Sequence, residues 1–205
     1  MRLFCARGTI SVAAAITLTE AGLDWQPVLL DFASAQQTRP EYLAINPKGR
    51  VPALEIAPGR ILTETGAILD YIAAIAPEAG LLPDEPAEAA HVRSVMYYLA
   101  STMHVNHAHK LRGARWADQP TSHADMTAKV PQTMTASAGF VTSDCLRGDY
   151  VLGDRFSIAD PYLFTVCNWL EGDGVSLADF PRIAAFLDRM NARDSVARVR
   201  AEGIL

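Results

Sequence analysis

The chain has 205 residues, of which 50% are hydrophobic and 20% are charged. This composition suits a buried core and excludes intrinsic disorder, and the length is enough for two modest domains. The formal net charge is −5, from 18 basic and 23 acidic residues, which excludes the basic footprint of proteins that bind nucleic acid or anionic membranes.

The cysteines and the N-terminal residues bear on where the protein works. The chain has an odd number of cysteines, namely Cys5, Cys145 and Cys167, and they are widely spaced and include no Cys-x-x-Cys pair. This pattern is unlike that of a disulfide framework or a structural zinc site. Residues 1–10 hold no long apolar run, and no apolar stretch is long enough to cross a bilayer. We therefore expect a cytoplasmic protein with no secretory signal, no membrane segment and no metal.

The first elements alternate between strand and helix. Residues 2–5 and 26–32 are short apolar runs that predict two strands. Residues 9–21, which are rich in alanine, isoleucine and valine, predict a helix between these strands, and Gly22 marks its end. Residues 40–45 predict a short helical turn.

A β-hairpin and a third helix follow. Residues 51–56 and 60–62 flank a turn at Gly59 and predict the hairpin. Residues 63–76 predict a helix, because their apolar positions form one stripe. The stripe consists of Ile68, Leu69, Ile72 and Ile75. The order β-α-β-α-β-β-α is that of a thioredoxin-like α/β domain.

A change of composition separates this region from the rest of the chain. Residues 77–88 contain three prolines, one glycine and four acidic residues, which is typical of a linker. We therefore expect a thioredoxin-like domain over residues 1–77, a linker over residues 78–87 and an all-helical domain over residues 88–205.

The patterns after the linker are helical throughout. A long first helix is predicted by apolar residues with a period near 3.6. These residues are Val92, Val95, Met96, Leu99 and Met103. Residues 121–146 predict a second helix, made irregular by Pro131, and further helices are predicted after Ser157, after Pro181 and at the C-terminus. Ser157 and Asp160 have the spacing of a capping box.

Three stretches of the chain resemble the glutathione S-transferase family. They are EYLAINPKGRVPALEI at residues 41–56, LTETGAILDYIA at residues 62–73 and SIADPYLF at residues 157–164. The resemblance covers nearly the whole chain and is closest to the bacterial beta-like members. It implies a thioredoxin-like domain that binds glutathione, followed by an all-α domain, in a homodimer.

The resemblance implies that glutathione is held by Arg50, Val51, Pro52, Glu64 and Thr65. In the family this proline follows a cis peptide bond, which leaves the N–H and C=O of Val51 free to pair with an extended peptide such as glutathione. Thr65 and the backbone at the helix start would receive the γ-glutamyl carboxylate, and Glu64 would pair with the ammonium. Without the resemblance, a trans turn proline and simple helix capping are the commoner interpretations.

Candidates for activating the sulfur of glutathione lie where the first helix begins. Thr9 and Ser11 place hydroxyls at the positive end of that helix, where each is either a donor to a thiolate or only an N-cap. Beta-class relatives carry a cysteine just before the serine, whereas this chain has Ile10, which excludes a mixed disulfide with glutathione there. Cys5 is interpreted as a buried small hydrophobe, with a redox thiol as the alternative.

All five histidines lie between residues 91 and 123. His104 and His107 share a helix face, but no third ligand is at hand, so we expect no metal site. The resemblance makes His104 the residue whose ring faces the glutathione sulfur, and a solvated or helix-packed histidine is the alternative. His107 and His109 are expected to be neighbours without such a role.

The second substrate is less well defined. Tyr97, Tyr98, Met103 and Trp116 either line its pocket or belong to the packing of the helices. The resemblance implies conjugation of the glutathione thiolate to a small apolar electrophile, a detoxification reaction. Two alternatives stay open: a glutathione-dependent thiol or disulfide reductase that uses Cys5, and a non-catalytic glutathione-binding module.

Overall fold

A computed structural model describes residues 1–205 of the chain. They form two compact units: residues 1–89 together with residues 190–205, and residues 90–189. The sequence predicts one helical domain over residues 88–205, whereas the structure groups the segment 190–205 with the first unit. No helix is long and apolar enough to cross a bilayer.

The first unit is built on a four-stranded sheet with the strand order β2-β1-β3-β4. Strand β1 (Arg2–Cys5) pairs in parallel with β2 (Gln26–Leu29) and antiparallel with β3 (Ala53–Ala57). Strand β3 pairs antiparallel with β4 (Arg60–Thr63), which completes the predicted hairpin. The β-α-β-α-β-β-α order of the unit confirms the predicted thioredoxin-like fold.

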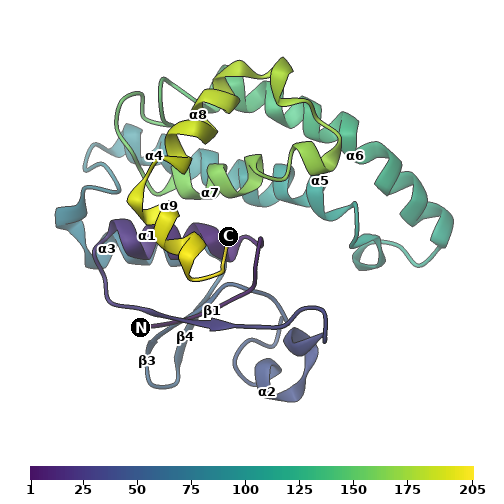
Figure 1. The fold of residues 1–205 in the computed structure, drawn as a ribbon, viewed down its shortest axis with the longest axis horizontal. Coiled ribbons are helices and arrows are strands. Elements are labelled where there is room, and N and C mark those ends of the chain that lie inside the picture. The colour runs from purple at the N-terminus through teal and green to yellow at the C-terminus, as the bar shows by residue number, and fades with distance from the viewer. The chain divides into compact units, whose positions relative to one another are not determined.

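Helices cover both faces of this sheet. Successive side chains of a strand point to opposite sides, so each face presents its own apolar residues to the helices that cover it. Phe4 and its partner Ala53 share a cluster with Tyr42 of the short helix α2 (Pro40–Leu43). The alternate positions, Leu3 and Leu54, face the other side. Figure 1 shows α1 (Ser11–Glu20) and α3 (Thr65–Ile75) packed side by side over the sheet.

The C-terminal segment packs against α1 within the first unit. Helix α9 (Asp194–Ala201) lies beside α1 in Figure 1. Its approach is fixed by Arg193, whose guanidinium donates to both carboxylate oxygens of Glu20 at 2.6 and 2.8 Å. The N–H of Gly8 donates to the carbonyl of Ile204 at 2.9 Å.

The second unit is helical, and two of its helical paths continue through a π-helical turn; the first path begins at the end of the first unit. Helix α4 (Pro86–Tyr98) runs into a π-helical turn, η3 (Leu99–Met103), and on into α5 (His104–Ala108). Helix α6 (Pro120–Phe140) contains Pro131 and continues into a second π-helical turn, η5 (Val141–Cys145). These two paths match the predicted first and second helices.

Shorter elements complete the chain. The remaining helices are α7 (Ala159–Cys167) and α8 (Pro181–Asn191). Short 3₁₀ turns, which the sequence did not predict, are η1 (Gln36–Thr38), η2 (Pro77–Ala79), η4 (Gly113–Arg115), η6 (Glu171–Asp173) and η7 (Leu177–Asp179).

The capping pattern at Ser157 and Asp160 is a structural feature. Both residues are fully buried, and Asp160 accepts hydrogen bonds from the N–H and the hydroxyl of Ser157 at 2.7 and 2.8 Å. Asp160 also accepts the N–H of Val151 at 2.9 Å. The Ser157 hydroxyl accepts a hydrogen bond from the N–H of Ala159, two residues later. In a standard capping box it would accept the N–H of the residue three positions later.

Candidate functional site

The strand register of the first unit brings three loops to one end of the sheet. Phe4 pairs with Ala53, and Ala53 pairs with Thr63. The chain that leaves β1, the turn that enters β3 and the chain that leaves β4 therefore meet at the same end. Most of the site residues predicted from the sequence lie on these three loops.

The turn before β3 presents an unpaired peptide group. The Val51–Pro52 bond is cis, as predicted. The carbonyl of Arg50 is held by the Tyr42 hydroxyl at 2.6 Å and by the amide of Asn46 at 2.7 Å. Neither the N–H nor the C=O of Val51 forms a hydrogen bond within the chain. This backbone can accept an extended peptide as an additional strand.

The loop after β4 opens helix α3. Glu64 adopts a positive φ of 72°, which is unusual for a residue other than glycine. The first helical bond runs from the N–H of Ile68 to the carbonyl of Glu64, so the N–H groups of the first turn have no partner within the helix. The Thr65 hydroxyl makes no hydrogen bond within the chain. Together these groups form a positive, donor-rich end for a carboxylate.

Lys48 was not predicted as a site residue. Its ammonium contacts the carboxylate of Glu64 and donates to the Thr63 hydroxyl at 2.8 Å. The Glu64 side chain is 67% exposed, so the pair is a surface salt bridge that stabilises by at most about 1 kcal/mol. The ammonium of a ligand can therefore share Glu64 with Lys48 or displace Lys48 from it. The contact between Lys48 and Glu64 depends on the fold, which brings these distant residues together, so no local sequence pattern predicts it.

The two hydroxyls at the start of α1 differ in exposure. Ser11 is fully buried, while Thr9 is partly exposed. Their oxygens lie 2.6 Å apart. Ser11 accepts the N–H of Ala6 at 3.1 Å, and Thr9 donates to the carbonyl of Ala6 at 2.7 Å. Neither side chain caps the helix in the usual way, because the N-cap position is Ile10.

The thiol of Cys5 is buried at the end of β1. It is fully inaccessible and lies 3.9 Å from the carbonyl of Val28. Burial raises its pKa to about 12, with the Val28 carbonyl acting weakly in the other direction. A thiol in this state is a small hydrophobe and a poor nucleophile, as the sequence interpretation favours.

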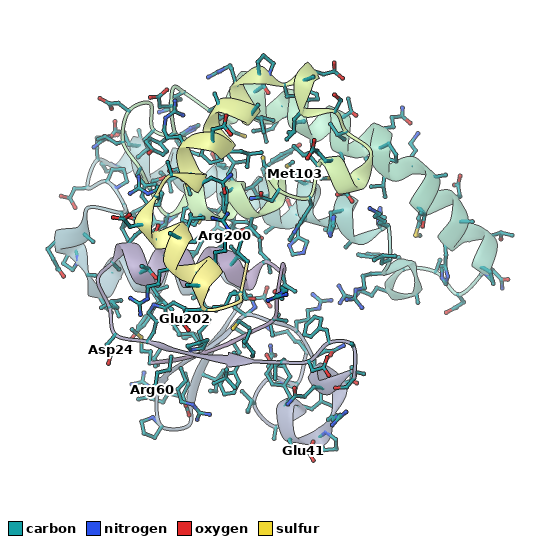
Figure 2. The ribbon with its side chains drawn as sticks, in the orientation of Figure 1. Asp24, Glu41, Arg60, Met103, Arg200 and Glu202 are labelled. Carbon is teal, nitrogen blue, oxygen red and sulfur yellow. The ribbon has the colours of Figure 1, made fainter.

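The remaining candidates belong to the second unit. The His104 ring packs against Trp169, with ring centroids 5.1 Å apart. Met103 is fully buried and therefore belongs to the helical core, where Figure 2 labels it. Tyr97 and Trp116 are exposed, and Tyr98 packs on Phe140.

Comparison with known proteins identifies both parts of the chain. Residues 1–74 match the family model of the glutathione S-transferase N-terminal domain, and residues 117–194 match that of the C-terminal domain. Glutathione S-transferase GstA of Escherichia coli O157:H7 is 33% identical over the full length of both proteins.

Solved structures agree with the sequence matches. A glutathione transferase homolog from Sulfitobacter, crystallised with bound glutathione, is 64% identical, with a TM-score of 0.98 over 100% of this chain and 98% of that one. The beta-class glutathione S-transferase of Sphingomonas chungbukensis is 31% identical, with a TM-score of 0.86 over both full chains. These matches and the two domain models confirm the resemblance found in the sequence. The chain therefore belongs to the glutathione S-transferase family and is a glutathione transferase.

Proposed function

We propose that the protein conjugates the sulfur of glutathione to a small apolar electrophile. The observation that carries this proposal is the unpaired peptide group of Val51 at the same sheet end as the donor-rich start of α3. A tripeptide with a free carboxylate and ammonium at one end matches both features. The bound glutathione in the Sulfitobacter homolog supports the same ligand.

Each part of glutathione has a partner in this proposal. The cysteinyl backbone pairs with the N–H and C=O of Val51, presented by the cis bond to Pro52. The γ-glutamyl carboxylate meets the hydroxyl and N–H of Thr65, and the ammonium meets Glu64. Arg50 directly precedes Val51, and its exposed guanidinium forms no hydrogen bond within the chain. It is therefore the proposed partner of the glycyl carboxylate.

Thr9 is the proposed donor to the sulfur. A free thiol with a pKa near 8.5 is only a few per cent ionised at pH 7. Lowering that pKa by about two units requires roughly 2.7 kcal/mol of differential stabilisation, which a hydroxyl at a helix start can contribute to. Buried Ser11 serves to position Thr9. His104 is proposed as a second group that tunes the thiolate, through its imidazole.

The two alternatives have less support. A reductase that uses Cys5 requires a thiolate, but the thiol is fully buried with a raised pKa. A non-catalytic binding module is tested by turnover with a model electrophile such as a halogenated dinitrobenzene. We also propose that the protein is a cytoplasmic homodimer and works in detoxification; the three free, buried cysteines suit a reducing compartment.

Calorimetry of glutathione binding tests the placement of the site. Glu64→Ala should weaken binding by roughly 1–3 kcal/mol, because it leaves the ammonium of the ligand unpaired. Glu41→Ala is the matched control: it removes the same charge from an exposed position on α2, labelled in Figure 2. Unchanged affinity in Glu64→Ala, or an equal loss in both variants, would place glutathione elsewhere.

A further inference from the structure

The chain between β1 and α1 forms a tight turn that carries Thr9. The N–H of Thr9 donates to the carbonyl of Ala6 at 3.3 Å, and the Thr9 hydroxyl donates to the same carbonyl at 2.7 Å. Gly8, the third residue of this four-residue turn, has a φ of +66°, which glycine adopts without strain. Because the Thr9 hydroxyl is bonded to the turn itself, the conformation of the turn sets where that hydroxyl lies.

Two carbonyls from the other end of the chain hold this turn. The N–H of Gly8 donates to the carbonyl of Ile204 at 2.9 Å, and Nε of Arg7 donates to the carbonyl of Gly203 at 3.2 Å. Arg7 and Gly8 are the two central residues of the turn. Figure 1 shows the C-terminal end of the chain beside the loop that enters α1. We call Gly203 and Ile204 the C-terminal clamp.

The way in which α9 ends presents the two carbonyls of the clamp. The N–H of Gly203 donates to the carbonyl of Arg200 at 3.0 Å, and the N–H of Ile204 donates to that of Val199 at 3.2 Å. These two bonds, with a φ of +73° at Gly203, form a Schellman motif. Val199 and Ile204 are fully buried, as is typical of the apolar pair in this motif. The N–H groups of the clamp are thus used within α9, and its carbonyls are used by the turn.

The start of α9 is anchored at the opposite end of α1. Glu20, the last residue of α1, accepts hydrogen bonds from the Arg193 guanidinium at 2.6 and 2.8 Å and from the Ser195 hydroxyl at 2.5 Å. Helix α9 therefore runs antiparallel to α1 and is bound to it near both ends. The clamp is held in place by a helix that is itself fixed, so it can restrain the turn.

We propose that Gly203 and Ile204 are positioning residues for the reaction. Through Arg7 and Gly8 they fix the turn that directs the Thr9 hydroxyl toward the sulfur of glutathione. The inference rests on the proposed role of Thr9 as the donor to the thiolate. A hydrogen bond weakens steeply when its donor is poorly aligned, and a donor that is already oriented needs no reorganisation when charge develops. A restrained turn therefore stabilises the thiolate more than a mobile one.

Ultraviolet titration of the thiolate in the complex with glutathione tests the clamp with two variants of one residue. Proline cannot adopt a positive φ and has no N–H, so Gly203→Pro should turn the clamp away from Arg7 and Gly8. Asparagine tolerates a positive φ, and a Cβ at this position lies 3.6 Å from Nη2 of Arg7, an ordinary contact. Gly203→Pro should raise the pKa of the bound thiol by about half a unit or more, about threefold in its ionisation constant. Gly203→Asn should leave this pKa near the native value, and an unchanged pKa in Gly203→Pro would overturn the proposal.

A double-mutant cycle shows whether the clamp acts through Thr9. In Thr9→Val there is no hydroxyl to misplace, so adding Gly203→Pro should raise the pKa of the bound thiol no further. The same rise in both backgrounds would overturn the proposal. If Thr9→Val alone leaves the pKa unchanged, the proposed role of Thr9 fails and this inference fails with it. A rise in Thr9→Val without one in Gly203→Pro refutes only the clamp.

Two variants of Arg7 decide the question if Gly203→Pro does not fold. Arg7→Gln places a side-chain N–H as many bonds from the backbone as Nε, so it can still donate to the carbonyl of Gly203. Arg7→Met has a similar length and no donor. Both remove the positive charge, so the difference between them reports the hydrogen bond alone. The bound thiol should have a higher pKa in Arg7→Met than in Arg7→Gln, by about twofold or more in its ionisation constant. Equal values in the two variants would overturn the proposal.

Discussion

At the scale of single residues, two hydroxyls share one acceptor at the start of α1. Thr9 donates to the carbonyl of Ala6 at 2.7 Å, and the Ser11 oxygen lies 3.2 Å from the same carbonyl. When Thr9 turns its proton toward a thiolate, Ser11 can keep that carbonyl hydrogen-bonded. No buried acceptor is then left unpaired, so the donation costs little.

Ser11→Ala should therefore destabilise the protein. The substitution leaves the buried N–H of Ala6 without its partner, which should lower the free energy of unfolding by about 1–3 kcal/mol. Urea unfolding followed by circular dichroism measures this. Thr9→Val keeps the bond between Ala6 and Ser11 and should cost less. A larger loss in Thr9→Val than in Ser11→Ala would contradict the proposed division of roles.

The site was only partly predictable from the sequence. The motif around Val51 and Pro52 predicted the cis bond, because the family resemblance overrides the general preference for trans. Lys48 was not predicted, since its partner Glu64 lies far away in the sequence.

At the scale of elements, the contact between α1 and α9 is held by a partly buried charge network. Glu20 receives both hydrogen bonds of Arg193 and that of the Ser195 hydroxyl at 2.5 Å. Burial alone would raise the pKa of Glu20, but these hydrogen bonds and the charge of Arg193 outweigh it, and the pKa is lowered. A carboxylate with a lowered folded-state pKa stabilises the fold above its unfolded pKa and loses that contribution as the pH falls.

The difference in the free energy of unfolding between the native protein and Glu20→Gln should therefore decrease as the pH falls. Near pH 7 the native protein should be more stable by about 1–3 kcal/mol, since the variant loses charge-assisted hydrogen bonds. The difference should shrink as the pH falls below the unfolded value of about 4.3. Urea midpoints at several pH values measure it. Glu202→Gln, on an exposed residue labelled in Figure 2, is the control; a pH-independent difference for Glu20→Gln would contradict the assignment.

The local sequence pattern predicted the types of the elements better than it predicted how these elements group into domains. Strand β1 spans the predicted residues 2–5, because its apolar run is short and bounded. Strand β2 ends at Leu29, earlier than predicted, although the apolar pattern continues to residue 32. The segment 190–205 joins the first unit through Glu20, Arg193 and the carbonyl of Ile204. These partners are distant in sequence, so periodicity could not reveal them.

At the scale of the whole molecule, the two units carry different chemistry. The first unit, residues 1–89 with 190–205, holds the residues proposed to bind glutathione and Thr9, the proposed donor to its sulfur. The second unit, residues 90–189, holds His104, which is proposed to tune the thiolate.

The central claim is that the first unit binds glutathione as a thiolate. Its most direct test is an ultraviolet titration of the thiolate in the complex of the protein with glutathione, in the native protein and in Thr9→Val. The account predicts that the bound thiol has a pKa about two units below the free value near 8.5, and that Thr9→Val raises it by about one unit. A bound thiol that titrates like free glutathione in the native protein would contradict the account.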